Sequence, residues 1–233
     1  MIEKSQRSAA KVLGVVYPLT FVIVTAAFMR FYAPYLNWNN KAETARNFFV
    51  HERAIRMYIA AALIYGAGLV ALLTALYVIL RPVSRALALF AAFCRLAYAF
   101  LWFVMLLDIF GALRVMASAG SSPALELDRL PILAGLQLSL SLDAYYIGLG
   151  FYGLGTLIFG YLWLKSRYIP RALAAWGMLA STFAGFCAFA FLLFPGFGKV
   201  ISVNWYELPL LLFELPTSLW VLIKGLRPGS VQG

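Results

Sequence analysis

Six long, nearly uncharged apolar runs are the feature that most constrains this chain. Each is about 20 residues long, the length that an α-helix needs to cross the hydrocarbon core of a bilayer. The runs are continuous and do not alternate with polar residues, so they predict helices and not the strands of a membrane barrel. They are Val12–Phe31, Met57–Leu80, Ala86–Leu107, Ala144–Leu164, Ala172–Phe194 and Tyr206–Ile223.

Composition supports the same class of protein. Hydrophobic residues make up 64% of the chain and charged residues 12%, whereas soluble domains have roughly 45–50% and about 25%. We therefore predict an all-α, polytopic membrane protein, with residues 1–233 forming one integral membrane domain of six transmembrane helices. The first run follows a basic segment and could be mistaken for a secretion signal, but its length favours a retained span.

The basic residues determine the predicted topology. A formal charge of +10 would suit a nucleic-acid-binding protein, but Lys and Arg lie in short clusters between the apolar runs, so we predict no nucleic-acid partner. The densest clusters are in residues 4–11, 81–85, 165–171 and 224–227. They predict that both termini face the cytoplasm, with the lipid bilayer as partner and anionic headgroups as possible ligands.

The predicted loop over residues 37–56 has the pattern of a short amphipathic helix on the membrane surface. Asn40 can cap this helix, and Glu43 stands three residues later, as in a capping box. The apolar residues that fall mostly on one face of it are Ala42, Ala45, Phe48, Phe49 and Ile55. A simple connector without this role is the equally open alternative.

The longest predicted loop covers residues 115–135. Ser121, Ser122, Pro123 and Pro131 favour turns or a helix start. Residues 132–143 are apolar enough to extend the fourth span outward, which would give a helix longer than the bilayer is thick.

Arg95 stands in the middle of an otherwise uncharged apolar run, and Glu214 stands in the middle of another. A charge at that depth costs at least about 2.5 kcal/mol, so Arg95 is expected to face the protein interior and a partner. Arg95 lies about 14 Å from the inner start of its span and Glu214 about 12 Å from the outer start of its own, at 1.5 Å per residue. Both depths are near the midplane, so we predict that the two side chains pair.

The helix face that carries Arg95 also carries small residues, together with Tyr98 and Trp102. Small residues permit close helix packing, and the two aromatic side chains offer hydrogen-bond donors. Two main interpretations are open for Arg95 and Glu214, namely a structural ion pair between helices and a site for a ligand, ion or proton. A third, in which Arg95 faces lipid and extends to the membrane surface, is less favoured because Arg95 is far from either interface.

Further charges are predicted near the outer ends of the spans. These residues are Asp108, Asp143, Glu207, Arg56 and Arg114. They are either ordinary interfacial charges or the rim of an outward-facing polar vestibule that leads to Glu214.

Glycines in the fourth and fifth spans predict close helix contacts. GLGFYGLG in the fourth span is a literal G-x-G-x-x-G, but it lies inside an apolar run and not between a strand and a helix, so a dinucleotide site is not expected. Gly177, Ser181 and Gly185 follow a small-xxx-small spacing in the fifth span.

Signals for metal binding and catalysis are weak. Cys94 and Cys187 both lie in apolar runs, and His51 is the only histidine, so no metal site is predicted. No serine-hydrolase, zinc-protease or P-loop motif occurs in the chain. The sequence leaves the cofactor and the oligomeric state open.

Several segments carry a resemblance to a known family. YVILRPVSRALALFAAFCRL and KSRYIPRALA, together with IGLGFYGLGTLIFGYL and FELPTSLWVLIKG, resemble a prokaryotic membrane family known as domain of unknown function 4386. The Arg-Pro-Val turn with Arg95-Leu96 is the most specific part. The resemblance implies six membrane spans and supplies no activity, and it places Arg56, Arg95 and Glu214 at polar positions of the family pattern. Family members often carry a His before the I-G-L of the fourth span, whereas Asp143 is the ionisable residue there.

Three functions remain as hypotheses. The first is binding or translocation of a small amphipathic or anionic ligand in an outward-facing cavity between spans 2, 3, 4 and 6. The second is an intramembrane enzyme that uses Glu214 or Asp143 for acid–base catalysis. The third is a structural or partner subunit whose charges only fix helix packing.

Overall fold

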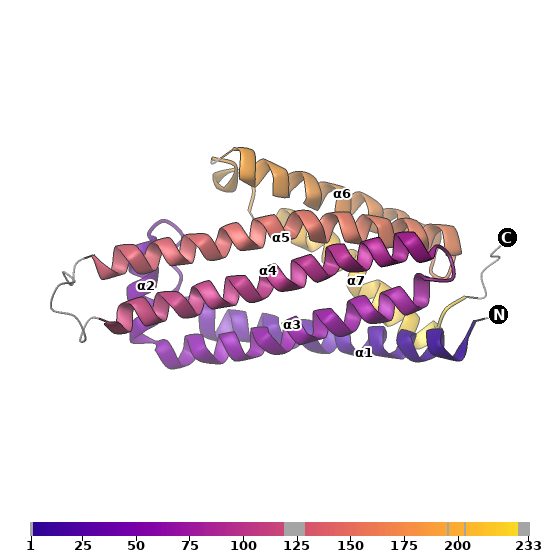
Figure 1. Cartoon of the computed structure of the whole chain (residues 1–233), viewed down its shortest axis with the longest axis horizontal. Helices are drawn as coiled ribbons and strands as arrows, with labels where there is room; N and C mark the ends of the chain where they lie inside the picture. Colours follow the sequence, from indigo (N-terminus) through magenta and orange to yellow (C-terminus); the bar gives the residue numbers. More distant parts are fainter. Residues whose placement is uncertain (1, 119–128, 195, 203, 228–233) are drawn as a thin grey trace. The chain divides into compact units, whose positions relative to one another are not determined.

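The computed structural model describes residues 2–118, 129–194, 196–202 and 204–227, and it confirms the all-α, six-span prediction. Six helices are long and apolar enough to cross a membrane, and the described residues contain no β-strand. The long helices are α1 (Lys4–Ala27), α3 (Glu52–Leu80), α4 (Arg85–Ala117), α5 (Leu130–Ser166), α6 (Arg171–Leu193) and α7 (Asn204–Lys224) (Figure 1).

Most of these helices extend beyond the predicted apolar runs. A π-helical turn, Phe28–Tyr32, and a 3-10 turn, Ala33–Tyr35, continue α1. α5 has 37 residues and contains residues 132–143, as the apolar pattern of that segment predicted. Pro131 lies in the first turn of α5. Backbone N–H groups in a first turn make no hydrogen bond within the helix, so a proline there costs none. The predicted turn at Ser121, Ser122 and Pro123 lies outside the described residues.

The predicted surface helix is shorter than the segment 37–56. It is α2, Lys41–Val50, and the Oδ1 atom of Asn40 accepts a hydrogen bond from the Glu43 N–H at 3.1 Å. The Glu43 carboxylate accepts from the Asn37 side-chain amide and does not close the predicted capping box. His51 ends α2, and the remaining residues form the first turn of α3, so that span begins earlier than predicted.

The chain divides into two compact units, which are described separately here. Unit 1 contains residues 1–19, 67–99 and 146–233, and unit 2 contains residues 20–66 and 100–145. Helices α1, α3, α4 and α5 contribute residues to both. The prediction of a single membrane domain stays a prediction.

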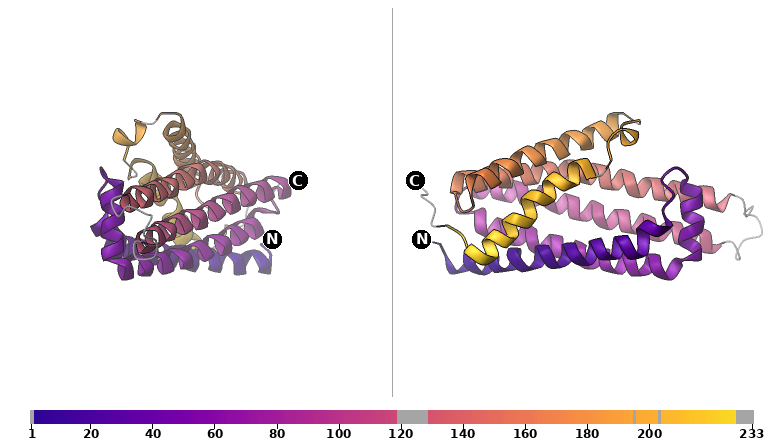
Figure 2. Two further views of the ribbon diagram at one scale, coloured as in Figure 1. Left: turned by 60° about the vertical axis from the view of Figure 1, so that its left-hand side comes forward. Right: turned by 180° about the vertical axis from the view of Figure 1, so that it is seen from behind.

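Unit 1 has a core of large apolar side chains at one end of its helices. Phe159, Leu162 and Trp163 of α5 are buried there with residues of α1, α3 and α7. In Figure 2 α7 runs obliquely and its C-terminal end meets the N-terminal part of α1. Gly14 lets the two helices approach, because a Cβ atom on Gly14 would lie 2.6 Å from the Cβ atom of Leu222.

Unit 2 has its own core. Phe48 of α2 and Ile55 of α3 are fully buried there, together with Ile109 and Leu113 of α4. α2 packs against α5 at Gly135, where a Cβ atom would lie 3.1 Å from the backbone nitrogen of Ala42. The buried side of α2 therefore contacts protein, since Thr44, Ala45 and Phe48 are its buried residues.

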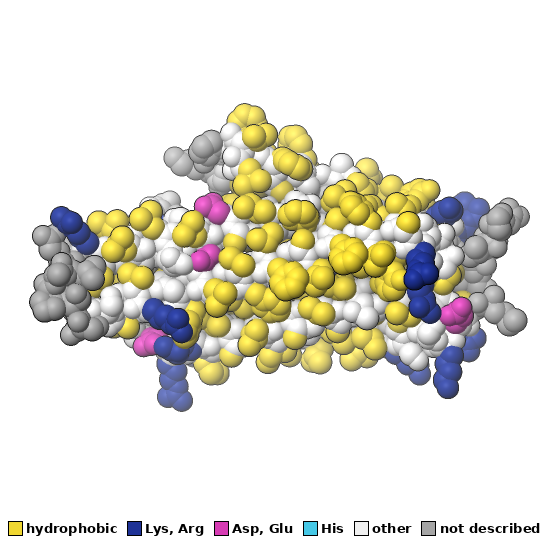
Figure 3. All heavy atoms as spheres, in the orientation of Figure 1, with side chains coloured by type: hydrophobic (Ala, Val, Ile, Leu, Met, Phe, Trp, Pro, Cys, Tyr) yellow, Lys and Arg dark blue, Asp and Glu magenta, His cyan; other side chains and the backbone are white. Residues whose placement is uncertain are grey.

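The exposed surfaces of the long helices are apolar. On α6 the side chains of Leu179, Phe186 and Phe189 are each more than 60% exposed. In Figure 3 hydrophobic side chains cover the middle parts of the helices, and Lys and Arg gather toward helix ends. Apolar surface on this scale needs a nonpolar solvent, which for a protein of this kind is the lipid bilayer.

Candidate functional site

Arg95 and Glu214 form a buried ion pair in unit 1. The Nη1 atom of Arg95, on α4, lies 3.0 Å from the Oε1 atom of Glu214, on α7, and their side chains are 5% and 14% exposed. The contact predicted from the depths of the two residues is therefore present. Its role as a site stays a prediction.

Helix α5 completes the surroundings of the guanidinium. Nη1 of Arg95 donates a 2.7 Å hydrogen bond to the hydroxyl oxygen of Thr156, which is buried. The centre of the guanidinium lies 3.9 Å from the ring centroid of Tyr152, a cation–π contact. Tyr98, which is also buried, packs edge-on against the Tyr152 ring at 4.8 Å. Helices α5 and α7 thus supply the charge, hydroxyl and aromatic partners of one buried cation on α4.

Gly155 makes this close arrangement possible. A Cβ atom on Gly155 would lie 3.0 Å from both the Ala91 carbonyl oxygen and the Cγ atom of Arg95. Without a side chain at this position, α5 can lie close enough to α4 for Thr156 to reach the guanidinium. The glycine-rich segment therefore serves helix packing, as its place inside an apolar run predicted.

A small cavity adjoins the ion pair. Its volume is about 30 Å³, and about 10–15 Å³ on this measure is enough to hold one water molecule. Its walls are Leu13, Tyr17, Leu72, Leu76, Arg95, Thr156, Phe159, Trp163, Phe213, Glu214, Thr217 and Ser218.

The hydroxyl group of Thr217 has no hydrogen-bond partner among the described residues. Thr217 lines the cavity and is 4% exposed, so its hydroxyl is also cut off from bulk solvent. Leaving such a group unpaired costs about 1–3 kcal/mol. This hydroxyl therefore indicates that the cavity suits a polar occupant.

Five of the six spans contribute to the walls of the cavity. Spans 2, 3, 4 and 6 contribute to its walls as predicted, and the first span contributes as well. The prediction that the cavity faces outward stays a prediction.

The other predicted site residues are not gathered around Arg95 in unit 1. Asp143 and Arg56 belong to unit 2 and are exposed, and Arg56 forms a 2.6 Å ion pair with Glu52 one turn away. Glu207, in the first turn of α7, is exposed too. The indole N–H of Trp102 donates to the Ala62 carbonyl of α3 at 3.0 Å.

Two more of the predicted vestibule charges also have neighbours within unit 2. The Asp108 carboxylate accepts a 2.7 Å hydrogen bond from the Gln137 amide. The guanidinium groups of Arg56 and Arg114 lie 4.9 Å and 4.7 Å from the ring centroid of Phe110. The vestibule itself stays a prediction.

Sequence reasoning missed Thr156, Tyr152 and Thr217. Thr156 directly follows Gly155, so a hydroxyl next to the glycine that permits close packing was the available signal. Thr217 stands three residues after Glu214 and so falls on the same side of the helix. Within the described parts of the chain, no group of three or more His, Cys, Asp or Glu residues could hold a metal ion.

A family comparison now completes the description. The model of the family described as "Domain of unknown function (DUF4386)" matches residues 12–225. The chain belongs to this family. No curated protein and no solved structure matches it. In this DUF4386 protein the matched segment includes every wall residue of the cavity and both members of the ion pair.

Proposed function

We propose that this DUF4386 protein binds a small anionic or amphipathic ligand at the Arg95–Glu214 centre, where the ligand's anionic head takes the place of the Glu214 carboxylate on Arg95. The observation that carries the proposal is the buried Thr217 hydroxyl, which lines a cavity beside Arg95 and has no partner among the described residues. Arg95 supplies the cation, and its planar guanidinium suits carboxylates and phosphates.

The size and lining of the cavity set the kind of ligand. A volume of about 30 Å³ accommodates a water-sized group, so a larger head needs the space that Glu214 occupies. Phe159, Trp163 and Phe213 line the same cavity and would contact an apolar tail. The ligand therefore places its anionic head where Glu214 lies, and a hydrocarbon tail, being larger than the cavity, extends past these aromatic side chains into the space between the helices.

A carboxylate series tests this proposal directly. The probes are acetate, butyrate, hexanoate and octanoate, with the matching primary alcohols as uncharged controls, and the readout is thermal unfolding in a nonionic detergent. We expect stabilisation by the carboxylates that grows with tail length, and none in Arg95→Gln. Glu214→Gln removes the carboxylate that competes with the ligand for Arg95. This variant should therefore be stabilised by lower carboxylate concentrations than the wild type needs. Equal responses to acids and alcohols would contradict the proposal.

A structural role is the second candidate, and one observation favours it. The guanidinium already contacts Glu214, Thr156 and Tyr152 in a buried position, an arrangement that holds three helices together with no ligand. On this alternative no carboxylate stabilises the wild type, and Glu214→Gln only destabilises it. The ion-pair partner of Glu214 makes a free catalytic acid the less favoured hypothesis.

Placement in the cell is part of the proposal. We infer a prokaryotic inner membrane from the prokaryotic family that the chain resembles. The dense basic clusters in residues 4–11, 81–85, 165–171 and 224–227 support the placement of both termini on the cytoplasmic side. Cysteine labelling from either side of sealed vesicles tests this orientation. In right-side-out vesicles, a cysteine added near residue 230 should react with a membrane-impermeant reagent only after permeabilisation. In inverted vesicles it should react without permeabilisation.

A further inference from the structure

A second concave site lies in unit 1 where α3 ends and α4 begins, away from the ion pair. It has a volume of about 400 Å³ and is lined by Glu3, Tyr77, Arg81, Pro82 and Arg85. This volume falls in the range of small-molecule pockets, roughly 300–1,000 Å³. We call it the headgroup pocket.

The headgroup pocket lies where two membrane spans end. Leu80 is the last residue of α3 and Arg85 the first of α4, and the turn between them contains Arg81 and Pro82. Span ends lie at the level of the lipid headgroups, where Tyr side chains and basic residues concentrate. Tyr77 is one helical turn before Arg81 and has this interfacial character.

The charges in the headgroup pocket have both signs. Arg81 and Arg85 bring two guanidinium groups, which suit a phosphate. Arg85 also opens α4, and the first turn of a helix attracts anions. Glu3 brings one carboxylate, and its Oε2 atom lies 3.8 Å from Nη2 of Arg81, beyond hydrogen-bonding distance. Both side chains remain about half exposed and available to a ligand.

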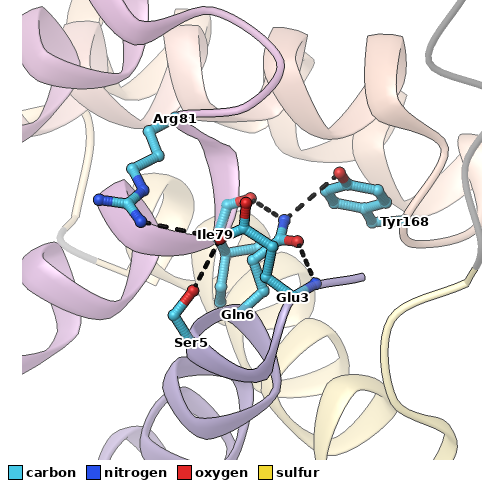
Figure 4. Close-up of polar contacts among 6 residues, drawn as sticks. All are labelled: Glu3, Ser5, Gln6, Ile79, Arg81 and Tyr168. Carbon is cyan, nitrogen blue, oxygen red and sulfur yellow. Dashed lines mark hydrogen bonds and ion pairs between the residues drawn. The ribbon is translucent and has the colours of Figure 1, made fainter. Parts of the chain in front are cut away.

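Neighbouring residues hold Glu3 in position, as Figure 4 shows. The Ser5 hydroxyl donates to the Glu3 carboxylate at 3.0 Å, and the Glu3 N–H donates to the Gln6 side-chain oxygen at 3.0 Å. Gln6 is buried and donates to the Ile79 carbonyl at 2.8 Å and to the Tyr168 hydroxyl at 3.4 Å. These bonds fasten the start of α1 to the end of α3, so the carboxylate is fixed beside the two arginines.

We propose that the headgroup pocket binds the headgroup of a phospholipid that carries a primary ammonium, with its phosphate at Arg81 and Arg85 and its ammonium at Glu3. The adjacent guanidinium and carboxylate match the adjacent phosphate and ammonium of a phosphoethanolamine headgroup. A purely anionic headgroup would place its charges beside the Glu3 carboxylate, which is unfavourable. A choline headgroup has no N–H to donate to that carboxylate.

Lipid retention in detergent provides the main test. The purified wild-type protein is mixed with phosphatidylethanolamine, phosphatidylglycerol and phosphatidylcholine of identical acyl chains, and bound lipid is counted by native mass spectrometry. We expect one tightly retained phosphatidylethanolamine. Occupancy should fall about tenfold in Arg81→Gln or Arg85→Gln, the loss expected from one charge-assisted contact. Arg171→Gln is the matched control, because Arg171 opens α6 as Arg85 opens α4 but does not line the pocket.

A second variant and two soluble probes make the test specific. Glu3→Gln should still bind a phospholipid but lose the preference for phosphatidylethanolamine over phosphatidylglycerol. Soluble glycerophosphoethanolamine should compete with the lipid, whereas inorganic phosphate should not. If Arg81→Gln and Arg85→Gln do not fold, competition on the wild type decides. An equal loss in Arg171→Gln, an unchanged preference in Glu3→Gln or equal competition by inorganic phosphate would each overturn the proposal.

Discussion

The guanidinium of Arg95 lies 3.0 Å from the carboxylate of Glu214, 119 positions further along the chain. This contact joins α4 to α7 inside unit 1, and the hydrogen bond to Thr156 adds α5 to the same centre. A single buried cation thus connects three helices. Removing any one of its partners should therefore affect the protein in a different and measurable way.

Breaking the ion pair from one side should be strongly destabilising. Glu214→Gln leaves a buried guanidinium without its counter-charge, and losing one partner of a buried pair costs about 3–5 kcal/mol. Arg95→Met leaves the Glu214 carboxylate without its cation. Because Glu214 is slightly more exposed than Arg95, we expect Arg95→Met to lose less stability than Glu214→Gln. Thermal or denaturant unfolding in detergent measures both.

The double variant Arg95→Met with Glu214→Leu is the control for this experiment. It removes both charges and leaves apolar side chains of similar length, an exchange that is often nearly neutral. We expect it to be more stable than either single variant. With Glu214→Leu measured alone as the matching single variant, a double variant as unstable as the sum of the Arg95→Met and Glu214→Leu losses would show that the pair contributes no coupling energy.

The membrane spans and the depth of the ion pair could be predicted because they depend on local properties. Twenty apolar residues need a bilayer, and depth along a helix follows from counting residues. Arg95 and Glu214 were found in this way. The small volume of the cavity could not be predicted, because it depends on how Trp163, Phe159 and Phe213 fill the space around the pair.

Hydrogen bonds between side chains in the membrane spans were harder to predict than the ion pair. Trp102 shares a predicted face with Arg95, yet its N–H donates to the Ala62 carbonyl. Thr156 was missed because a hydroxyl in an apolar run most often bonds to the carbonyl one turn earlier in its own helix, as Thr182 does with Met178. Only the approach of α5 to α4 brings the Thr156 hydroxyl to Arg95.

The contact between α5 and α6 should respond differently to two neighbouring glycine substitutions. A Cβ atom on Gly153 would lie 2.9 Å from the backbone nitrogen of Gly185, whereas a Cβ atom on Gly185 would meet nothing within 4 Å. Gly153→Ala should therefore cost about 1–3 kcal/mol through overpacking. Gly185→Ala should be neutral or up to about 1 kcal/mol stabilising, because alanine favours the helix. Equal effects in thermal unfolding would contradict this close approach.

Alkaline pH should stabilise α2 through Lys41. Burial lowers the pKa of the Lys41 ammonium, so the folded state disfavours its charged form. The loss of stability from burying the charged ammonium is complete below this lowered pKa. It disappears as the pH rises toward the pKa that Lys41 has in the unfolded chain. As the pH rises from below this lowered pKa toward about 10.4, the ordinary pKa of a lysine, the wild type should therefore gain stability relative to Lys41→Met. A constant difference between the two proteins would show that Lys41 is fully solvated.

Thr156 and Thr217 provide a matched pair of hydroxyl deletions at the candidate site. Thr156→Val removes the acceptor of a buried charge-assisted hydrogen bond from Arg95, so it should cost about 1.5–3 kcal/mol. Thr217→Val removes a buried hydroxyl that has no partner among the described residues, so it should leave stability unchanged or raise it by about 1 kcal/mol. The same Thr217→Val protein should lose part of its stabilisation by octanoate, because its hydroxyl lines the proposed binding cavity. Thermal unfolding with and without octanoate separates these effects. An unchanged stabilisation by octanoate in Thr217→Val would contradict the proposed role of this hydroxyl in ligand binding.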